Sequence, residues 1–130
     1  MPYHPKVLVV DDDENILSAF SDFLKKERCD MIATSSADEA MEQLGCHHID
    51  LLISDVRLKA RSGVTFLIHA KQLYPKLPTV VITGYPDVIN EKDAKAFGAD
   101  YFFLKPLDLD KLREAVRRCL HLNSVSLHKD

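Results

Sequence analysis

The chain has 130 residues, of which 46% are hydrophobic and 28% charged, and its formal net charge is -3. A chain of this length forms one domain with a core of its own, and its charge excludes a broad basic surface for nucleic acid. No apolar run approaches the roughly 18 residues of a membrane span, so we expect contact with neither nucleic acid nor membrane. The three cysteines lack metal-ligand spacing and indicate reduced thiols in the cytoplasm.

Short apolar runs alternate along the chain with amphipathic segments. The apolar runs predict strands over residues 6–10, 31–34, 50–55, 79–82 and 100–104. The amphipathic segments predict a helix after each strand, and we expect the third and fourth helices over residues 64–74 and 88–97. Because strand and helix alternate five times, we expect a parallel sheet with helices on both faces.

Some residues are expected to end these helices or to face the core. The predicted N-caps are Asp13, Ser36 (in a capping box with Glu39) and Asp108, and the predicted C-cap is Gly98. The third helix is expected to bury Val64, Leu67, Ile68 and Leu73. The fourth helix has a thin apolar stripe, so we expect it to be the least stable.

Polar side chains follow four of the predicted strands. The three acids at positions 11–13 follow the first strand, and Asp55 ends the third. Thr83 follows the fourth strand and Lys105 the fifth. The carboxyl ends of parallel strands meet at one edge of a sheet, where ligands bind. Taken singly, these residues are also consistent with a helix cap, a turn, a strand position and a solvated lysine.

Taken together, the same residues predict a site for a metal ion and a phosphate. Carboxylates brought within about 5 Å repel one another, which raises a pKa or recruits a cation. Mg²⁺ is usually held by one or two carboxylates beside a phosphate. An ammonium and a hydroxyl are suitable partners for the remaining phosphoryl oxygens.

Four motifs resemble those of the receiver domain of two-component response regulators. They are Val9-Val10-Asp11-Asp12-Asp13, Ser54-Asp55-Val56-Arg57 followed by Gly63, Ile82-Thr83-Gly84-Tyr85, and Gly98-Ala99-Asp100 through Lys105-Pro106. The resemblance runs from about residue 6 to 122. It implies a flavodoxin-like (βα)5 three-layer α/β sandwich with a parallel five-stranded sheet in the order 2-1-3-4-5. It also implies a receiver domain over residues 1–123 and a C-terminal tail over 124–130.

The same resemblance assigns a role to each acid of the site. Asp55 is the phosphoacceptor, and it takes a phosphoryl group from phosphohistidine in the presence of Mg²⁺. Asp12 is implied as a direct Mg²⁺ ligand and Asp11 as a ligand acting mainly through water. Asp55 itself and the backbone carbonyl of Arg57 complete the implied set of metal ligands.

The resemblance further implies a switch. Lys105, whose bond to Pro106 is cis in this family, would pair with the phosphoryl group, and Thr83 would hydrogen-bond to it. Thr83 would move toward the new group, and Phe102 would turn into the vacated space. The family more often has tyrosine at the position of Phe102. Since phenylalanine has no hydroxyl group, the hydroxyl contact of the switch is absent here. The readout would be the face built from the fourth helix, fifth strand and fifth helix.

The resemblance also implies partners and is accompanied by departures. The donor would be a sensor histidine kinase or a histidine phosphotransfer protein, and the recipient a downstream protein or an output domain. Phosphorylation-dependent homodimers are a further expectation. Lys59 stands where the family often has proline, in a basic loop that either attracts an acidic patch on the kinase or is merely solvated. We hypothesise that bulky Arg57 and Tyr85 slow the loss of phosphate.

Two alternative functions fit parts of the pattern. Asp11 and Asp13 after an apolar strand also resemble the haloacid-dehalogenase-type phosphatases, in which the first aspartate is the nucleophile, although Asn15 departs from that motif. The other alternative is a protein-binding module of receiver fold that is not phosphorylated. The complete set of acids with Thr83 and Lys105 argues against this module. We expect a phosphoacceptor and not a turnover enzyme.

Overall fold

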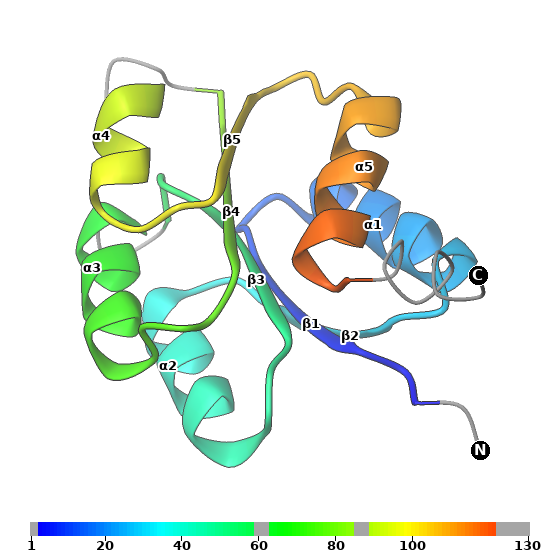
Figure 1. The fold of residues 1–130 in the computed structure, drawn as a ribbon, viewed down its shortest axis with the longest axis horizontal. Coiled ribbons are helices and arrows are strands. Elements are labelled where there is room, and N and C mark those ends of the chain that lie inside the picture. The colour runs from blue at the N-terminus through cyan, green and yellow to red at the C-terminus, as the bar shows by residue number, and fades with distance from the viewer. Residues whose placement is uncertain (1–2, 59–62, 85–88, 122–130) are drawn as a thin grey trace.

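The computed structural model describes residues 3–58, 63–84 and 89–121 of the chain, and these form a strict alternation of strands and helices (Figure 1). The strands are β1 (Lys6–Val10), β2 (Asp30–Thr34), β3 (Leu51–Asp55), β4 (Thr79–Thr83) and β5 (Tyr101–Leu104). The helices are α1 (Glu14–Lys26), α2 (Ala37–Cys46), α3 (Gly63–Leu73), α4 (Glu91–Ala96) and α5 (Leu109–Cys119). In the described part of the chain, no helix has the length and apolar character needed to cross a membrane.

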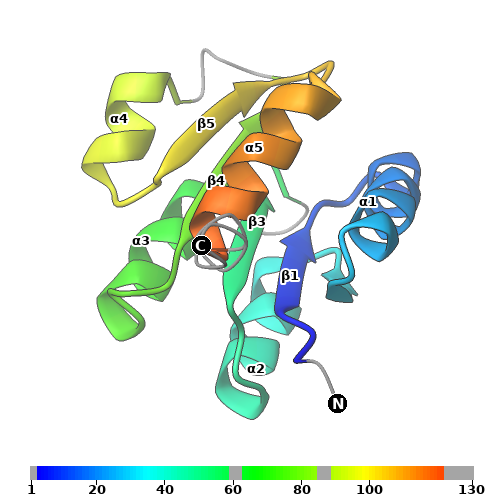
Figure 2. The same cartoon turned by 45° about the vertical axis from the view of Figure 1, so that its right-hand side comes forward.

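The strands form one parallel sheet in the order β2-β1-β3-β4-β5, which confirms the predicted topology. Helices α1 and α5 cover one face of the sheet, and α2, α3 and α4 cover the other (Figures 1 and 2). The molecule is therefore a three-layer sandwich. In such a sheet the carboxyl ends of all five strands lie at one edge.

The central strands are mostly apolar because both of their faces are covered. Side chains alternate along β1, so Val7 and Val9 pack against α1 and α5 while Leu8 and Val10 pack against α2 and α3. Every residue of β3 is buried, including its last residue, Asp55. This packing fixes the register of the strands and hence the positions of the residues at their ends.

The predicted N-caps are present, with one difference. Asp13 and Asp108 accept hydrogen bonds from backbone N–H groups of α1 and α5. Ser36 Oγ accepts a hydrogen bond from the Glu39 N–H at 3.2 Å. The Glu39 carboxylate, however, accepts from the N–H of Ser35 at 3.3 Å, one residue earlier than in a capping box.

Helix α4 is shorter than predicted. It begins at Glu91 because Asn90 is its N-cap: the Asn90 side chain accepts a hydrogen bond from the Asp93 N–H at 2.8 Å. Ile89 is buried but lies outside the helix, and residue 88, the predicted start, is outside the described residues. After the helix, Gly98 has a φ of 111°, as expected for its predicted role at this helix end.

Helix α3 buries a different stripe from the one predicted. Gly63, Phe66, Leu67 and Ala70 are its buried residues. Leu73 is 55% exposed, whereas the next residue, Tyr74, packs against the α2–α3 core. The prediction for Leu73 was wrong because the stripe continues from Ala70 by four residues and not by three.

Candidate phosphoacceptor site

The predicted site residues meet at the carboxyl edge of the sheet. Asp11 directly follows β1, Asp55 ends β3 and Thr83 ends β4, and all three are buried. Lys105 directly follows β5, and its N–H donates a hydrogen bond to the Thr83 carbonyl at 2.8 Å. Each side chain is thus placed by a strand whose position the core determines. The bond between Lys105 and Pro106 is cis, as the resemblance implied.

Lys105 joins two of the acids. Its Nζ lies 2.9 Å from Asp11 Oδ2 and 3.0 Å from Asp55 Oδ2. The lysine side chain is 21% exposed, while both carboxylates are almost fully buried. One ammonium group therefore faces two carboxylates across positions that are 94 and 50 residues apart in the chain.

The other oxygen of Asp55 is held by the backbone. Asp55 Oδ1 accepts hydrogen bonds from the Val56 N–H at 2.6 Å and the Arg57 N–H at 3.2 Å. Since Oδ2 accepts from Lys105, the carboxylate is held on both sides. Buried carboxylates require such partners, because an unsolvated charge is costly. The result is a carboxylate with a defined orientation at the edge of the sheet.

The pKa values of Asp11 and Lys105 are both shifted from their ordinary values. Burial is the main cause that raises the pKa of Asp11 above its ordinary value, and the charge of Asp55 adds to it. The Asp13 N–H, which donates to Asp11 Oδ1 at 2.9 Å, and Lys105 act in the opposite direction. Burial lowers the pKa of Lys105, but the hydrogen bonds and charges of the two acids outweigh it and raise this pKa.

The donor set suits Mg²⁺. The edge presents two buried carboxylates and the half-buried Asp12, all hard oxygen ligands, and Mg²⁺ needs only one or two carboxylates if waters and a phosphate complete its shell. Lys105 supplies a single positive charge to Asp11 and Asp55, so negative charge remains for a cation. Among the described residues, no three His, Cys, Asp or Glu side chains are grouped closely enough to hold an ion by themselves. A shell completed by water fits this arrangement.

The two predicted switch residues lie on neighbouring strands, Thr83 at the end of β4 and Phe102 within β5. Thr83 is fully buried and pairs in register with Leu104. Phe102 is half-buried and packs against a cluster formed by α3, α4 and the loop after β3, which includes Val56, Ile89 and Ala94. The ring thus connects the loop beside Asp55 to helix α4.

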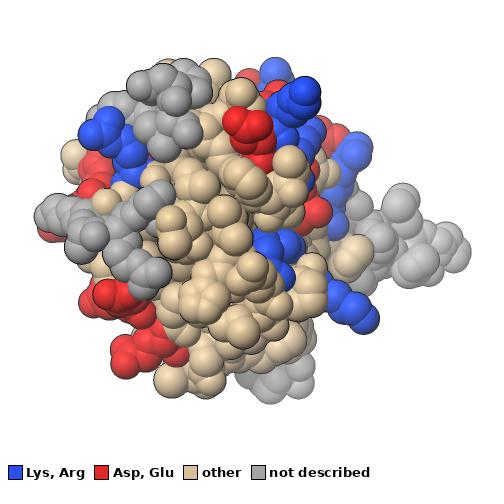
Figure 3. All heavy atoms as spheres, turned by 90° about the vertical axis from the view of Figure 1, so that its left-hand side faces the viewer, with Lys and Arg blue, Asp and Glu red and all other residues tan. Residues whose placement is uncertain are grey.

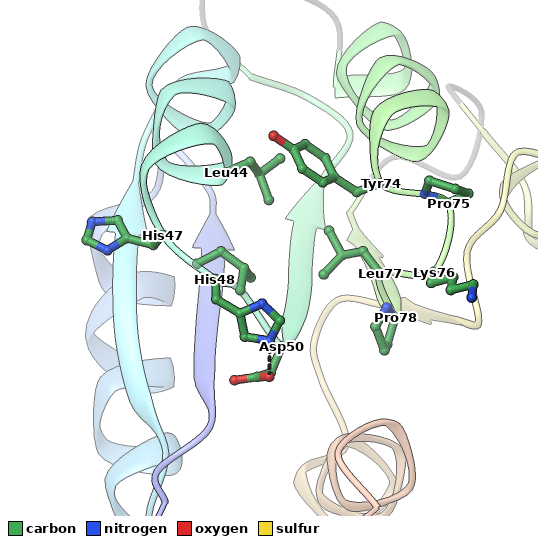
Figure 4. Close-up of a pocket in the computed structure, with 10 residues that line it drawn as sticks. Leu44, His47, His48, Asp50, Tyr74, Pro75, Lys76, Leu77 and Pro78 are labelled. Carbon is green, nitrogen blue, oxygen red and sulfur yellow. Dashed lines mark ion pairs between the residues drawn. The ribbon is translucent and has the colours of Figure 1, made fainter.

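A wide hollow lies at the opposite, amino edge of the sheet, away from these residues. It has a volume of about 420 Å³ and lies between the ends of α2 and α3. Leu44 and Tyr74 face each other across it, and His48 Nε2 lies 3.1 Å from Asp50 Oδ1 at its lower wall (Figure 4). None of the residues predicted for phosphate or metal lines it.

Sequence reasoning assigned no role to Ser54, although it directly precedes Asp55. Its side chain is buried, and its hydroxyl donates a hydrogen bond to the Asp55 carbonyl at 2.9 Å. The available signal is that Ser54 is the one hydroxyl-bearing residue of β3, whose other residues before Asp55 are leucine and isoleucine. A hydroxyl in a buried strand needs a partner.

Comparison with known proteins agrees with this geometry. The family model described as "Response regulator receiver domain" matches residues 7–117. The response regulator protein PilR of Pseudomonas aeruginosa is 33% identical over 119 residues, a match that covers 92% of this chain and 27% of PilR. Sporulation initiation phosphotransferase F of Bacillus subtilis is 26% identical over 119 residues, covering 92% of this chain and 96% of that protein.

Solved structures give the same result. A response regulator receiver domain protein (CheY-like) from Methanospirillum hungatei has a TM-score of 0.86 at 25% identity, covering 95% of this chain and 99% of that one. The chain spans about a quarter of the length of PilR and of the transcriptional regulatory protein ZraR of Escherichia coli. Motifs, topology and relatives agree that the chain belongs to the receiver domain family of two-component response regulators.

Proposed function

We propose that the chain accepts a phosphoryl group on Asp55 from a phosphohistidine of a sensor histidine kinase or a histidine phosphotransfer protein. The observation that carries this proposal is the buried contact of one lysine with two carboxylates at the ends of different strands. Buried, charged groups are costly to fold, and they gather where chemistry needs them. A purely structural edge would be cheaper with apolar residues.

The transfer is an in-line displacement at phosphorus. A carboxylate oxygen of Asp55 forms a bond to phosphorus, the bond from phosphorus to the imidazole nitrogen breaks, and its electron pair stays on that nitrogen. Lys105 donates hydrogen bonds to the equatorial oxygens. Mg²⁺, held by Asp11, Asp12, Asp55 and the Arg57 carbonyl, would neutralise charge on the same oxygens. The product is an acyl phosphate, which water later hydrolyses, so the chain is a phosphoacceptor and not a turnover enzyme.

Phosphorylation would be communicated through Thr83 and Phe102. Thr83 would hydrogen-bond to the phosphoryl group, and the Phe102 ring would turn into the space that Thr83 leaves. The movement of the ring would affect α4, because the ring packs against a cluster that includes Ala94 of that helix. Helix α4 has six residues and buries only Ala94, so little packing resists a shift. The proposed readout is the surface of α4, β5 and α5, on which Phe97 and Leu104 are 38% and 49% exposed.

The proposed recipient is a protein target or an output domain that meets this surface. The side of the molecule next to this surface, formed by α3 and α4, has an uncharged middle with charged side chains around it (Figure 3). An uncharged contact face of this kind suits a protein partner or a second copy of the domain better than nucleic acid. Phosphorylation-dependent homodimers are part of the proposal.

Other details of the proposal concern the extent and location of the domain. We assign the receiver domain to residues 1–123 and a tail to 124–130. The cysteines at 29, 46 and 119 are free thiols, which supports a cytoplasmic location. The suggested effect of Arg57 and Tyr85 on phosphate loss stays a hypothesis, since Tyr85, like Lys59 in the basic loop, lies outside the described residues. The family match disfavours the haloacid-dehalogenase alternative.

The test is the intact mass after incubation with acetyl phosphate. We expect the wild-type chain to gain one phosphoryl group in the presence of Mg²⁺ and none after its removal by chelation. Asp55→Asn is expected to gain none, whereas Asp22→Asn, an exposed acid on α1, behaves as wild type. A wild-type chain that binds Mg²⁺ but gains no mass from either acetyl phosphate or a phosphorylated kinase would instead support the unphosphorylated binding module.

A further inference from the structure

The two peptide groups that follow Asp55 both direct their N–H toward its carboxylate. Asp55 Oδ1 accepts from the Val56 N–H at 2.6 Å and from the Arg57 N–H at 3.2 Å. Each peptide group is a rigid plane with the carbonyl and the N–H on opposite sides. Whatever holds the carbonyl of such a plane therefore also holds its N–H.

Ser54 holds the first plane. Its Oγ donates a hydrogen bond at 2.9 Å to the carbonyl of Asp55, which shares a peptide plane with the Val56 N–H. The Ser54 side chain is buried, so water does not replace this bond. The hydroxyl thus fixes one of the two N–H groups that orient the Asp55 carboxylate.

Gly63, the first residue of α3, holds the second plane. Its N–H donates a hydrogen bond at 3.0 Å to the carbonyl of Val56, which shares a peptide plane with the Arg57 N–H. A Cβ at position 63 would lie 2.5 Å from Val56 Cα and 2.6 Å from the Asp55 carbonyl oxygen. Glycine is required here for close approach, since any side chain would push α3 and these planes apart.

We propose that Ser54 and Gly63 are positioning residues for phosphoryl transfer, which clamp the two peptide planes after Asp55 and thereby aim its carboxylate. The inference rests on the proposed function, because it concerns the rate at which Asp55 is phosphorylated. The chain of contacts runs from Ser54 and Gly63 through the Val56 and Arg57 N–H groups to Oδ1, and it leaves Oδ2 facing Lys105. The same clamp places Arg57, whose carbonyl is a proposed metal ligand.

The test compares phosphorylation rates of variants that weaken each half of the clamp. We expect Ser54→Ala to be phosphorylated by acetyl phosphate about fivefold more slowly, the effect of one hydrogen bond. Ser54→Thr keeps the hydroxyl and should recover most of the rate. Gly63→Ala should be slowed roughly 10- to 100-fold, because displacement of a reacting group by about 1 Å has an effect of this size.

Matched controls separate positioning from stability. Ser18→Ala removes an exposed hydroxyl from α1, and Gly45→Ala adds a Cβ where no atom lies within 4 Å. Both should retain the wild-type rate.

For each variant, the melting temperature and the dependence of the rate on acetyl phosphate concentration are measured with Mg²⁺ at saturation. Misaiming lowers the maximal rate and leaves the half-saturating donor concentration unchanged. Amide hydrogen exchange of Val56 and Arg57, measured without Mg²⁺, should be faster in Ser54→Ala and Gly63→Ala.

The outcomes separate this inference from the proposed function. If the wild-type chain is phosphorylated and Ser54→Ala reacts at the same rate, the clamp is refuted while the phosphoacceptor stands. The same holds if Ser54→Ala and Ser54→Thr are slowed equally. If the wild-type chain takes no phosphoryl group from any donor, the proposed function fails and the positioning role with it. If Gly63→Ala does not fold, the serine pair decides.

Discussion

The carboxyl and amino edges of the sheet differ in their buried charge and in the volume of empty space beside them. At the carboxyl edge, Lys105 and two buried carboxylates fill the space between strands at hydrogen-bonding distance. At the amino edge, a hollow of about 420 Å³ is walled mostly by apolar side chains, and its ion pair joins Asp50 to a histidine whose side chain is 83% exposed. The buried charges therefore lie at the carboxyl edge and not in the hollow at the amino edge. In this fold, desolvated charge indicates the site better than volume does.

The comparison predicts its largest effect for the loss of the ammonium group. Lys105→Met leaves two buried carboxylates without a counter-charge, and we expect it to lower the free energy of unfolding at pH 7 by about 2 kcal/mol, since the lysine is partly exposed. Urea denaturation measures the loss. It should shrink at pH 5, because protonation of an acid relieves the repulsion. Lys95→Met, which removes an exposed pair with Glu91, is the control. Equal losses in the two variants would remove the distinction between buried and exposed pairs.

A divalent cation should act on one edge only. Mg²⁺ at about ten times its dissociation constant should raise the free energy of unfolding by about 1.4 kcal/mol. Asp50→Asn, at the amino edge, should keep this gain in full, whereas Asp12→Asn should lose most of it. Thermal melts with and without Mg²⁺ provide the measurement. A gain that disappears in Asp50→Asn would place the cation at the wrong edge.

Removal of one buried acid should stabilise the fold in the absence of metal. The folded pKa of Asp11 is raised above its ordinary value of 3.8, chiefly by burial. The folded chain therefore binds more protons than the unfolded chain as pH rises from that value, and stability is lost until Asp11 is ionised in both states. We expect Asp11→Asn to be more stable than wild type at pH 7 by about 1 kcal/mol.

The pH dependence of this effect identifies its cause. The advantage of Asp11→Asn should shrink as pH falls through the raised pKa of Asp11, because the wild-type acid then becomes neutral as well, and it should be absent below the ordinary value of 3.8. Asp22→Asn, on the surface of α1, should show no such dependence. A wild-type chain more stable at pH 7 than Asp11→Asn would mean that contact with Lys105 outweighs burial.

The smallest effect is expected for the ion pair at the amino edge. His48→Ala should change the free energy of unfolding by less than about 0.5 kcal/mol, because an exposed pair gains little over solvated partners. The phosphorylation rate should not change at all. A loss comparable to that of Lys105→Met would show that Asp50 depends on this histidine, despite also accepting hydrogen bonds from Tyr3 and from the Lys6 N–H.

The strands and the carboxyl edge were predictable because they depend on strong patterns. Strands buried on both faces are mostly apolar, and acids at or just after their ends stand out from that background, as Asp11 and Asp55 do. The strand order and the individual roles came from the resemblance, since no local pattern relates Asp11 to a lysine 94 residues away. The order is confirmed, and the roles remain proposals.

The misses have local physical causes. Helix α4 starts late because Asn90 offers its first turn a cap that a thin apolar stripe does not reveal. Leu73 is exposed and Tyr74 packs against the core, and helical spacing alone does not show which of these two neighbours is buried. The contact of Gly63 with the Asp55–Val56 peptide depends on the path of a loop between two elements. Such close approaches are set by tertiary structure and leave no periodic trace in the sequence.

The bridge made by Lys105 also has a consequence for synthesis of the protein. Asp11 follows the first strand and Lys105 follows the last, so the two meet only after β5 has joined the sheet. A chain still emerging from the ribosome, or one shortened before β5, has Asp55 without Lys105. On the proposed function, such a chain would be a poor substrate for its kinase. Efficient phosphorylation would then be restricted to chains in which all five strands have folded.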